Sequence, residues 1–106
     1  MNNNRLLELQ ELMGESFREI VELFVSQTAI DLDKIEKAIE ANDTEASRMA
    51  SHAIKSNCAT LGFSGMRDIM QQMEKLSSDG DLQGVAILHE NAREHYLQAV
   101  DMLKEL

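Results

Sequence analysis

One segment of the chain carries the residue types and the spacing best suited to chemistry. His52 and Lys55 lie three residues apart, which places both side chains on one face of a helix. Ile54 and Leu61 point to the opposite, apolar side. An ordinary imidazole is largely neutral near pH 7 and is then a good nucleophile, while a lysine supplies a mobile positive charge. The pair therefore suits attack on an activated phosphoryl group, which yields a high-energy phosphoramidate.

The surroundings of this pair favour an anion. The chain has a net charge of −9, yet no acidic residue occurs between Glu45 and Asp68. This window avoids repulsion of a phosphoryl group, which brings about two negative charges. Arg48 lies one turn before His52 and is a candidate for a second cation at the site. The other neighbours of the imidazole are small and leave it open to another protein: Ser51, Ser56 and Ala59.

The composition predicts that helices position this site. The 106 residues include no proline and only 5 glycines, and the apolar residues recur at intervals of three and four. We expect helices over 5–13, 15–40, 44–61, 64–76 and 81–103. Because the connections between them are short, consecutive helices should run antiparallel. The predicted fold class is all-α: an antiparallel up-down four-helix bundle with a short extra N-terminal helix, forming one domain over 1–106.

Turn and cap residues mark the predicted helix ends. Gly14 is expected to break or bend the chain, and Gly62 fits a C-terminal cap in the left-handed region. Ser64 and Asp81 are expected to cap the two helices that follow. The acidic residues within 31–36 are predicted to form a solvated face.

The other reactive side chains have structural interpretations. Cys58 faces the predicted core without an accompanying base, so we expect inert packing. His89 falls on the apolar stripe of the last helix and is interpreted as a core or boundary histidine with satisfied hydrogen bonds, whereas His95 lies at the edge of the surface. The three histidines lack metal-ligand spacing, so no metal site is expected.

Charge and composition also exclude several classes of function. A net charge of −9 and a pI of about 4.6 disfavour nucleic acid and anionic membrane surfaces as partners. No apolar segment approaches the roughly 18 residues that a bilayer span needs. The single cysteine gives no disulfide framework, and no glycine-rich loop suggests an ATP site or another cofactor. We therefore expect a cytoplasmic monomer that is not an autonomous kinase.

Residues 51–62, SHAIKSNCATLG, resemble the signature of histidine-containing phosphotransfer (HPt) domains, which reads approximately AHxLKGSSxxLG. The segment MEKL at 73–76 is similar to the family's Leu-Glu segment, and the turn at 79–81 falls where such domains have theirs. The resemblance implies that His52 accepts a phosphoryl group from a receiver-domain aspartate and passes it to another receiver. The implied partners are receivers of a hybrid sensor kinase and of a response regulator, and Mg²⁺ is expected only in those partners.

The same resemblance assigns roles to further residues. It implies that Lys55 stabilises the phosphoryl group and that Gly62 allows tight packing between the histidine helix and its neighbour. Glu74 best matches the polar side chain that orients the imidazole from the next helix, with Gln71 as the alternative. The implied partner-binding residues are Ser51, Ser56, Ala59, Gly62 and Arg67. Ser56 stands where the family usually has glycine, a difference that bears on the choice of partner.

Two other functions compete with this interpretation. A non-catalytic helical adaptor would dock a signalling partner through the same face without taking up phosphate. The pairing of His52 with Lys55 argues against it, because docking alone requires neither residue. A helical dimerisation module would leave an apolar stripe exposed, whereas the stripes of this chain are expected to be used within one bundle.

Overall fold

The computed structural model describes residues 4–106, which are helical apart from short turns and contain no strand. The helices of this part are α1 (Asn4–Met13), α2 (Glu15–Glu40), α3 (Thr44–Leu61), α4 (Ser64–Ser78) and α5 (Leu82–Lys104). The all-α class is thus confirmed, and the predicted helix bounds lie close to the observed ones. Across residues 4–106, none of these helices combines the length and apolar character that crossing a membrane would take.

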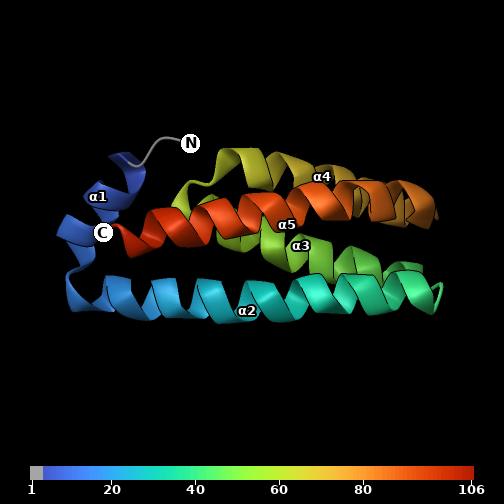
Figure 1. Ribbon diagram of the computed structural model, residues 1–106, viewed down its shortest axis with the longest axis horizontal. Helices are drawn as coiled ribbons and strands as arrows, with labels where there is room; N and C mark the ends of the chain where they lie inside the picture. The colour runs from blue at the N-terminus through green and yellow to red at the C-terminus, as the bar shows by residue number, and fades with distance from the viewer. Residues whose placement is uncertain (1–3) are drawn as a thin grey trace.

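The four longer helices lie lengthwise beside one another, and α1 lies at one end of them (Figure 1). Helix α3 packs mainly against α2 and α4, and α5 packs against the same two helices. The short α1 contacts α2 and α3. A site on the outer face of α3 is therefore flanked by α4 on one side and by α2 on the other.

The core consists of the apolar stripes that the spacing predicts. It includes fully buried side chains from all four long helices: Leu32 and Ile35 of α2, Ile54 and Cys58 of α3, Met66, Met70 and Met73 of α4, and Val85 and Ala92 of α5. Burial raises the pKa of the Cys58 thiol to about 12, which fits the predicted inert packing.

The predicted role of His89 is confirmed by its surroundings. Its side chain is buried, and Nε2 bonds to the main-chain carbonyl oxygen of Leu32 at 2.9 Å, which ties α5 to α2. Because a carbonyl oxygen only accepts, Nε2 carries the proton and donates it. His95 is partly exposed and bonds through Nδ1 to the carbonyl oxygen of Asn91 at 2.9 Å, as expected for a residue at the surface edge.

The side-chain cap predicted at Asp81 is confirmed, and Asp43 caps α3 in the same way. Asp43 accepts the main-chain N–H of Ala46 at 3.0 Å at the start of α3, and Asp81 accepts that of Gly84 at 2.9 Å at the start of α5. The predicted cap at Ser64 is wrong, because the N-cap of α4 is Phe63. The Phe63 ring is buried with its centroid 5.2 Å from that of Phe24, so core packing rather than a hydroxyl cap fixes this helix start.

Gly62 ends α3 in the left-handed conformation, with φ of 81° and its N–H bonded to the carbonyl oxygen of Cys58. A Cβ atom at this position would lie 2.6 Å from Cγ of Arg5 in α1. We expect Gly62→Ala to lower the free energy of unfolding by about 1–2 kcal/mol, because the left-handed region disfavours a side chain and Arg5 must move. Urea unfolding followed by circular dichroism measures this loss.

Gly80→Ala is the matched control for this substitution. Gly80 has φ of 79°, but nothing lies within 4 Å of a Cβ atom placed there. It therefore carries the backbone cost without the contact with Arg5. If Gly62→Ala unfolds at the same urea concentration as the unaltered protein, the prediction is contradicted. If Gly62→Ala loses no more free energy of unfolding than Gly80→Ala, the contact with Arg5 contributes nothing to the loss.

Candidate functional site

The predicted phosphoacceptor lies on α3 within reach of α4. The side chain of His52 is 56% exposed, and its Nδ1 lies 2.8 Å from Oε2 of Glu74. The sequence left both Glu74 and Gln71 open as the partner, and the structure brings Glu74 to the imidazole. Gln71 is exposed one turn earlier on α4 and lines the same surface hollow as Glu74 and Lys55.

Lys55 shares the same carboxylate. Its Nζ lies 2.6 Å from Oε1 of Glu74, and the two side chains are 27% and 19% exposed. Partial burial alone would raise the pKa of the Glu74 carboxyl, but the hydrogen bonds from Lys55 and His52 outweigh it and hold the pKa below its usual range. Glu74 is therefore a carboxylate near neutral pH, bonded to both predicted functional residues.

This arrangement selects one tautomer of the imidazole. A carboxylate can only accept hydrogen bonds, so Nδ1 of His52 must be the donor. In the neutral ring the lone pair then belongs to Nε2. The result is an oriented nucleophile on a side chain that is more than half exposed. Its proton on Nδ1 faces a negative charge that can stabilise a positive ring.

The predicted auxiliary cation is engaged elsewhere on α3. Nε of Arg48 lies 3.0 Å from Oε2 of Glu45, and a second guanidinium nitrogen contacts the other carboxylate oxygen. The hydrogen bond from Arg48 lowers the pKa of the Glu45 carboxyl. Arg48 stands one helical turn from His52, so it contributes positive charge nearby from within an ion pair rather than as a free side chain.

The predicted partner-binding residues of α3 divide into exposed and buried positions. Ser56 and Ala59 are exposed beside His52, as predicted. Ser51 is fully buried, so its predicted place on the binding face is wrong. It lies one turn after Ser47, whose hydroxyl bonds to that of Ser77 on α4 at 2.7 Å, and this side of α3 is covered by α4.

The remaining two predicted partner-binding residues lie away from the imidazole. Gly62 ends α3, and the side chain that crowds it is Arg5 of α1, so the close packing implied for this glycine is made with α1. Arg67 is 46% exposed near the start of α4 and lies 3.5 Å from Asp68. Seven residues, or about 10 Å of helix rise, separate Arg67 from Glu74.

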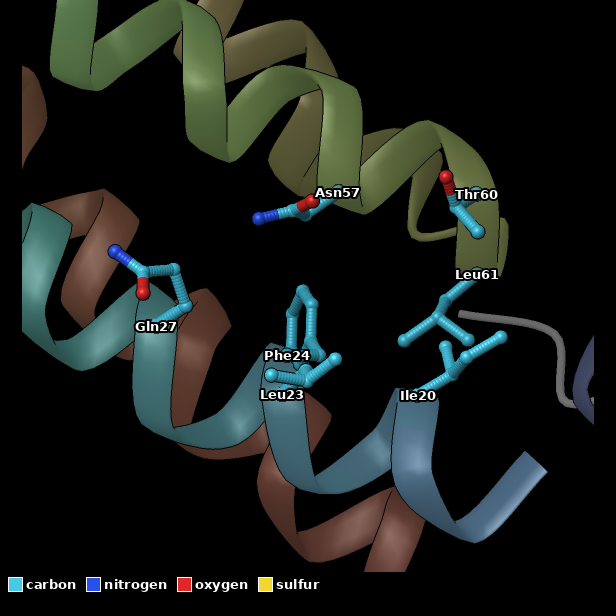
Figure 2. Close-up of a pocket in the computed structure, with 7 residues that line it drawn as sticks. All are labelled: Ile20, Leu23, Phe24, Gln27, Asn57, Thr60 and Leu61. Carbon is cyan, nitrogen blue, oxygen red and sulfur yellow. The ribbon is translucent and has the colours of Figure 1, made fainter. Parts of the chain in front are cut away.

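Sequence reasoning missed a groove on the other side of α3. Figure 2 shows its first hollow, lined by Leu23 and Phe24 of α2 and by Asn57 and Thr60 of α3, among others. A second hollow continues along the same two helices as far as Met49 and Asp31. The signal was available, since Leu23 falls outside the apolar stripe of its helix and yet is apolar.

The prediction that the acidic residues within 31–36 form a solvated face is wrong for one of them. Asp33 and Glu36 are exposed and lie 3.0 and 3.1 Å from Arg93 of α5, consistent with a solvated face. Asp31, in contrast, is buried and faces the α2–α3 groove. Its position on the helix is the reason, because it lies one turn before the core residue Ile35. Within the described residues no group of three His, Cys, Asp or Glu side chains could hold a metal ion.

The fold and this site define a class of protein. The sequence model of the Hpt domain matches residues 19–106, so the chain belongs to the Hpt domain family. Members of this family are histidine phosphotransfer proteins of phosphorelays, and they interact with the receiver domains of response regulators. The chain therefore acts in phosphorelay signalling as a phosphotransfer protein.

A solved structure shows the same fold. The crystal structure of histidine-containing phosphotransfer protein B (HptB) from Pseudomonas aeruginosa PAO1 superposes with a TM-score of 0.92 at 22% sequence identity. The match covers 99% of this chain and 91% of that chain. Comparison with curated protein sequences found no match.

Proposed function

We propose that His52 is the phosphoacceptor, that it takes the phosphoryl group from a receiver-domain aspartate and that it passes the group to a second receiver. The observation that carries this proposal is the bonding of Nδ1 to Glu74 on an exposed imidazole, with Lys55 on the same carboxylate. His89 and His95 lack such an arrangement, because their hydrogen bonds are to main-chain carbonyl oxygens.

The reaction follows from the tautomer. The Nε2 lone pair of His52 attacks the phosphorus of the aspartyl phosphate, so an N–P bond forms while the bond from phosphorus to the aspartate oxygen breaks. The aspartate leaves as a carboxylate. The phosphorylated ring keeps its proton on Nδ1 and becomes cationic, and the Glu74 carboxylate at 2.8 Å stabilises that charge. Transfer to a second receiver reverses these steps.

Lys55 has to change partner during this reaction. In the structure its ammonium group bonds to Glu74 at 2.6 Å. The incoming phosphoryl oxygens offer a second anion next to the same carboxylate, and the flexible lysine side chain can reach toward it. Arg48 lies one turn away and would have to leave its ion pair with Glu45 to act on the phosphoryl group. Ser56 and Ala59 are proposed to contact the receiver beside the imidazole, and Arg67 to contact it farther along, near the start of α4.

We expect Lys55→Ala to slow phosphotransfer about tenfold, because one charge-assisted hydrogen bond to the phosphoryl group is lost. The helix content should stay unchanged, since Lys55 is not part of the core. Rapid-quench measurement of label transfer from a phosphorylated receiver gives the rate, and circular dichroism gives the helicity. Unchanged transfer kinetics would refute this role of Lys55. Lys75→Ala, which removes an exposed lysine of α4, is the matched control.

We propose a single domain in which α2–α5 form an antiparallel up-down four-helix bundle, supported by the pairwise packing of those helices. The protein would be a cytoplasmic monomer without an ATP site or bound cofactor, and Mg²⁺ would reside in the partner. Its two partners would be receivers of a hybrid sensor kinase and of a response regulator.

The test of the proposed function is uptake of label from a receiver phosphorylated with radiolabelled acetyl phosphate. The proposal predicts label on the protein that is labile in acid and stable in base, the behaviour of a phosphoramidate. It also predicts that adding a second receiver removes this label. Stable binding of the receivers without uptake of label would favour the helical adaptor instead.

A further inference from the structure

The groove between α2 and α3 lies beside the proposed phosphoacceptor face. Its two hollows have volumes of about 320 and 630 Å³ and share Gln27 and Asn57, so they form one continuous depression. A liquid water occupies about 30 Å³, so the groove admits whole side chains. Ser56 lines the second hollow and lies one turn after His52, which makes the groove continuous with the imidazole face.

Two apolar side chains that line this groove are exposed. Leu23 of α2 lines the first hollow and is 65% exposed, and Met49 of α3 lines the second and is 59% exposed. Figure 2 shows Leu23 and Phe24 below the first hollow, Asn57 above it on α3, and Gln27 at its left end on α2. Exposed apolar side chains in both hollows of the groove favour contact with a partner.

One buried charge lies in this groove. Asp31 is 3% exposed and lines the second hollow. Its Oδ1 accepts a hydrogen bond from Nε2 of Gln27 at 3.2 Å, and Nζ of Lys34 lies 3.8 Å from the same oxygen. Its Oδ2 is buried and has no hydrogen-bond partner among residues 4–106. A buried carboxylate oxygen without a protein donor is unfavourable, and a donor brought by a partner would stabilise it.

We propose that Asp31 selects the receiver partner by accepting a hydrogen bond from a lysine or arginine side chain that the receiver inserts into the α2–α3 groove. The proposal rests on the proposed function, because the occupant is the receiver that reacts with His52. A cationic donor matches both the charge of Asp31 and its unused acceptor. Lys34, whose side chain is 61% exposed, is free to swing into solvent as the donor enters.

The alternative occupant is a second copy of this chain. The exposed apolar side chains would suit such a dimer. However, each copy has a net charge of −9, and the two copies would repel each other around Asp31. A receiver with a basic side chain at the contact has the complementary charge. Asp31 would thus act as a specificity-determining residue that touches the partner and not the transferred phosphoryl group.

The test measures label uptake against receiver concentration for the unaltered protein, Asp31→Asn and Glu40→Gln. The probes are receiver domains from the genome that encodes this chain, each phosphorylated with acetyl phosphate. Glu40→Gln is the matched control, because it removes the same charge from an exposed position of α2 in a hollow shared with α5. We expect Asp31→Asn to raise the half-saturating concentration of the preferred receiver about tenfold without changing the maximal rate.

Added salt should bring the half-saturating concentrations of Asp31→Asn and the unaltered protein closer together. The reason is that the interaction lost in the variant is between charges, which salt screens. Equal half-saturating concentrations for all three proteins would overturn the inference while leaving the proposed function intact. A lower maximal rate in Asp31→Asn would also overturn it, and so would a concentration-dependent dimer that Met49→Ser dissociates. No label on the unaltered protein from any receiver would instead contradict the proposed function. Thermal melts of the variants identify any loss of label uptake that is caused by unfolding.

Discussion

The His52→Gln variant is expected to take up no label from any phosphorylated receiver. Glutamine keeps a polar side chain of similar reach at this exposed position but has no nucleophilic nitrogen, so the N–P bond cannot form. Gel autoradiography after incubation with the labelled receiver measures the effect. Because His52 is 56% exposed and outside the core, the thermal melt of the variant should match that of the unaltered protein.

The matched control for this substitution is His95→Gln. His95 is the other histidine that is not buried, and its Nδ1 is bonded to the main chain of its own helix. The control should take up label at the rate of the unaltered protein. Equal acid-labile label on His52→Gln and on the unaltered protein would reject His52 as the acceptor. Loss of label in His95→Gln alone would move the acceptor to α5.

The Glu74→Ala variant is expected to accept phosphoryl about a hundredfold more slowly. Removing the carboxylate frees the imidazole to rotate and to place its proton on either nitrogen, and it leaves the cationic ring unbalanced during transfer. Lys55 loses its partner at 2.6 Å at the same time. Single-turnover kinetics at saturating receiver measure the effect, since the loss should fall on the maximal rate and not on the half-saturating concentration.

Two further variants separate a positioning role from a structural one. Glu74→Gln retains a carbonyl oxygen that can accept the proton of Nδ1, so the part of the rate that depends on the tautomer should return, while the part that depends on the charge stays lost. Gln71→Ala removes a polar side chain from the same hollow one turn earlier and should leave the rate unchanged. A Glu74→Gln variant as slow as Glu74→Ala would show that charge, and not the tautomer, controls the reaction.

The helices were predictable because residues close in the sequence determine where each helix begins and ends. Gly14, Gly62 and Asp81 act on their own neighbours through φ or a side-chain cap, and no knowledge of the packing is needed to interpret them. Ser64 was mispredicted because the start of α4 is fixed by burial of the Phe63 ring against α2, a contact between segments far apart in the chain.

The candidate site was predictable only in part for the same reason. The spacing of His52 and Lys55 places them on one face of one helix, which a sequence shows directly. The contact with Glu74 joins two helices and came from the family resemblance. Ser51 and Asp31 lie at the edges of their helices' apolar arcs, where a rotation of a few tens of degrees decides between burial and exposure. Only the packing of α3 against α4 and α2 settles them.

The most direct test of the central claim is to locate the phosphoryl group on the imidazole by nuclear magnetic resonance. The protein is labelled with ¹⁵N in its histidine rings and phosphorylated by a receiver. The hydrogen bond from Nδ1 to Glu74 predicts phosphorus coupled to Nε2 of His52, with the proton retained on Nδ1. Phosphorus coupled to Nδ1 of His52, or found on His89 or His95, would contradict the account.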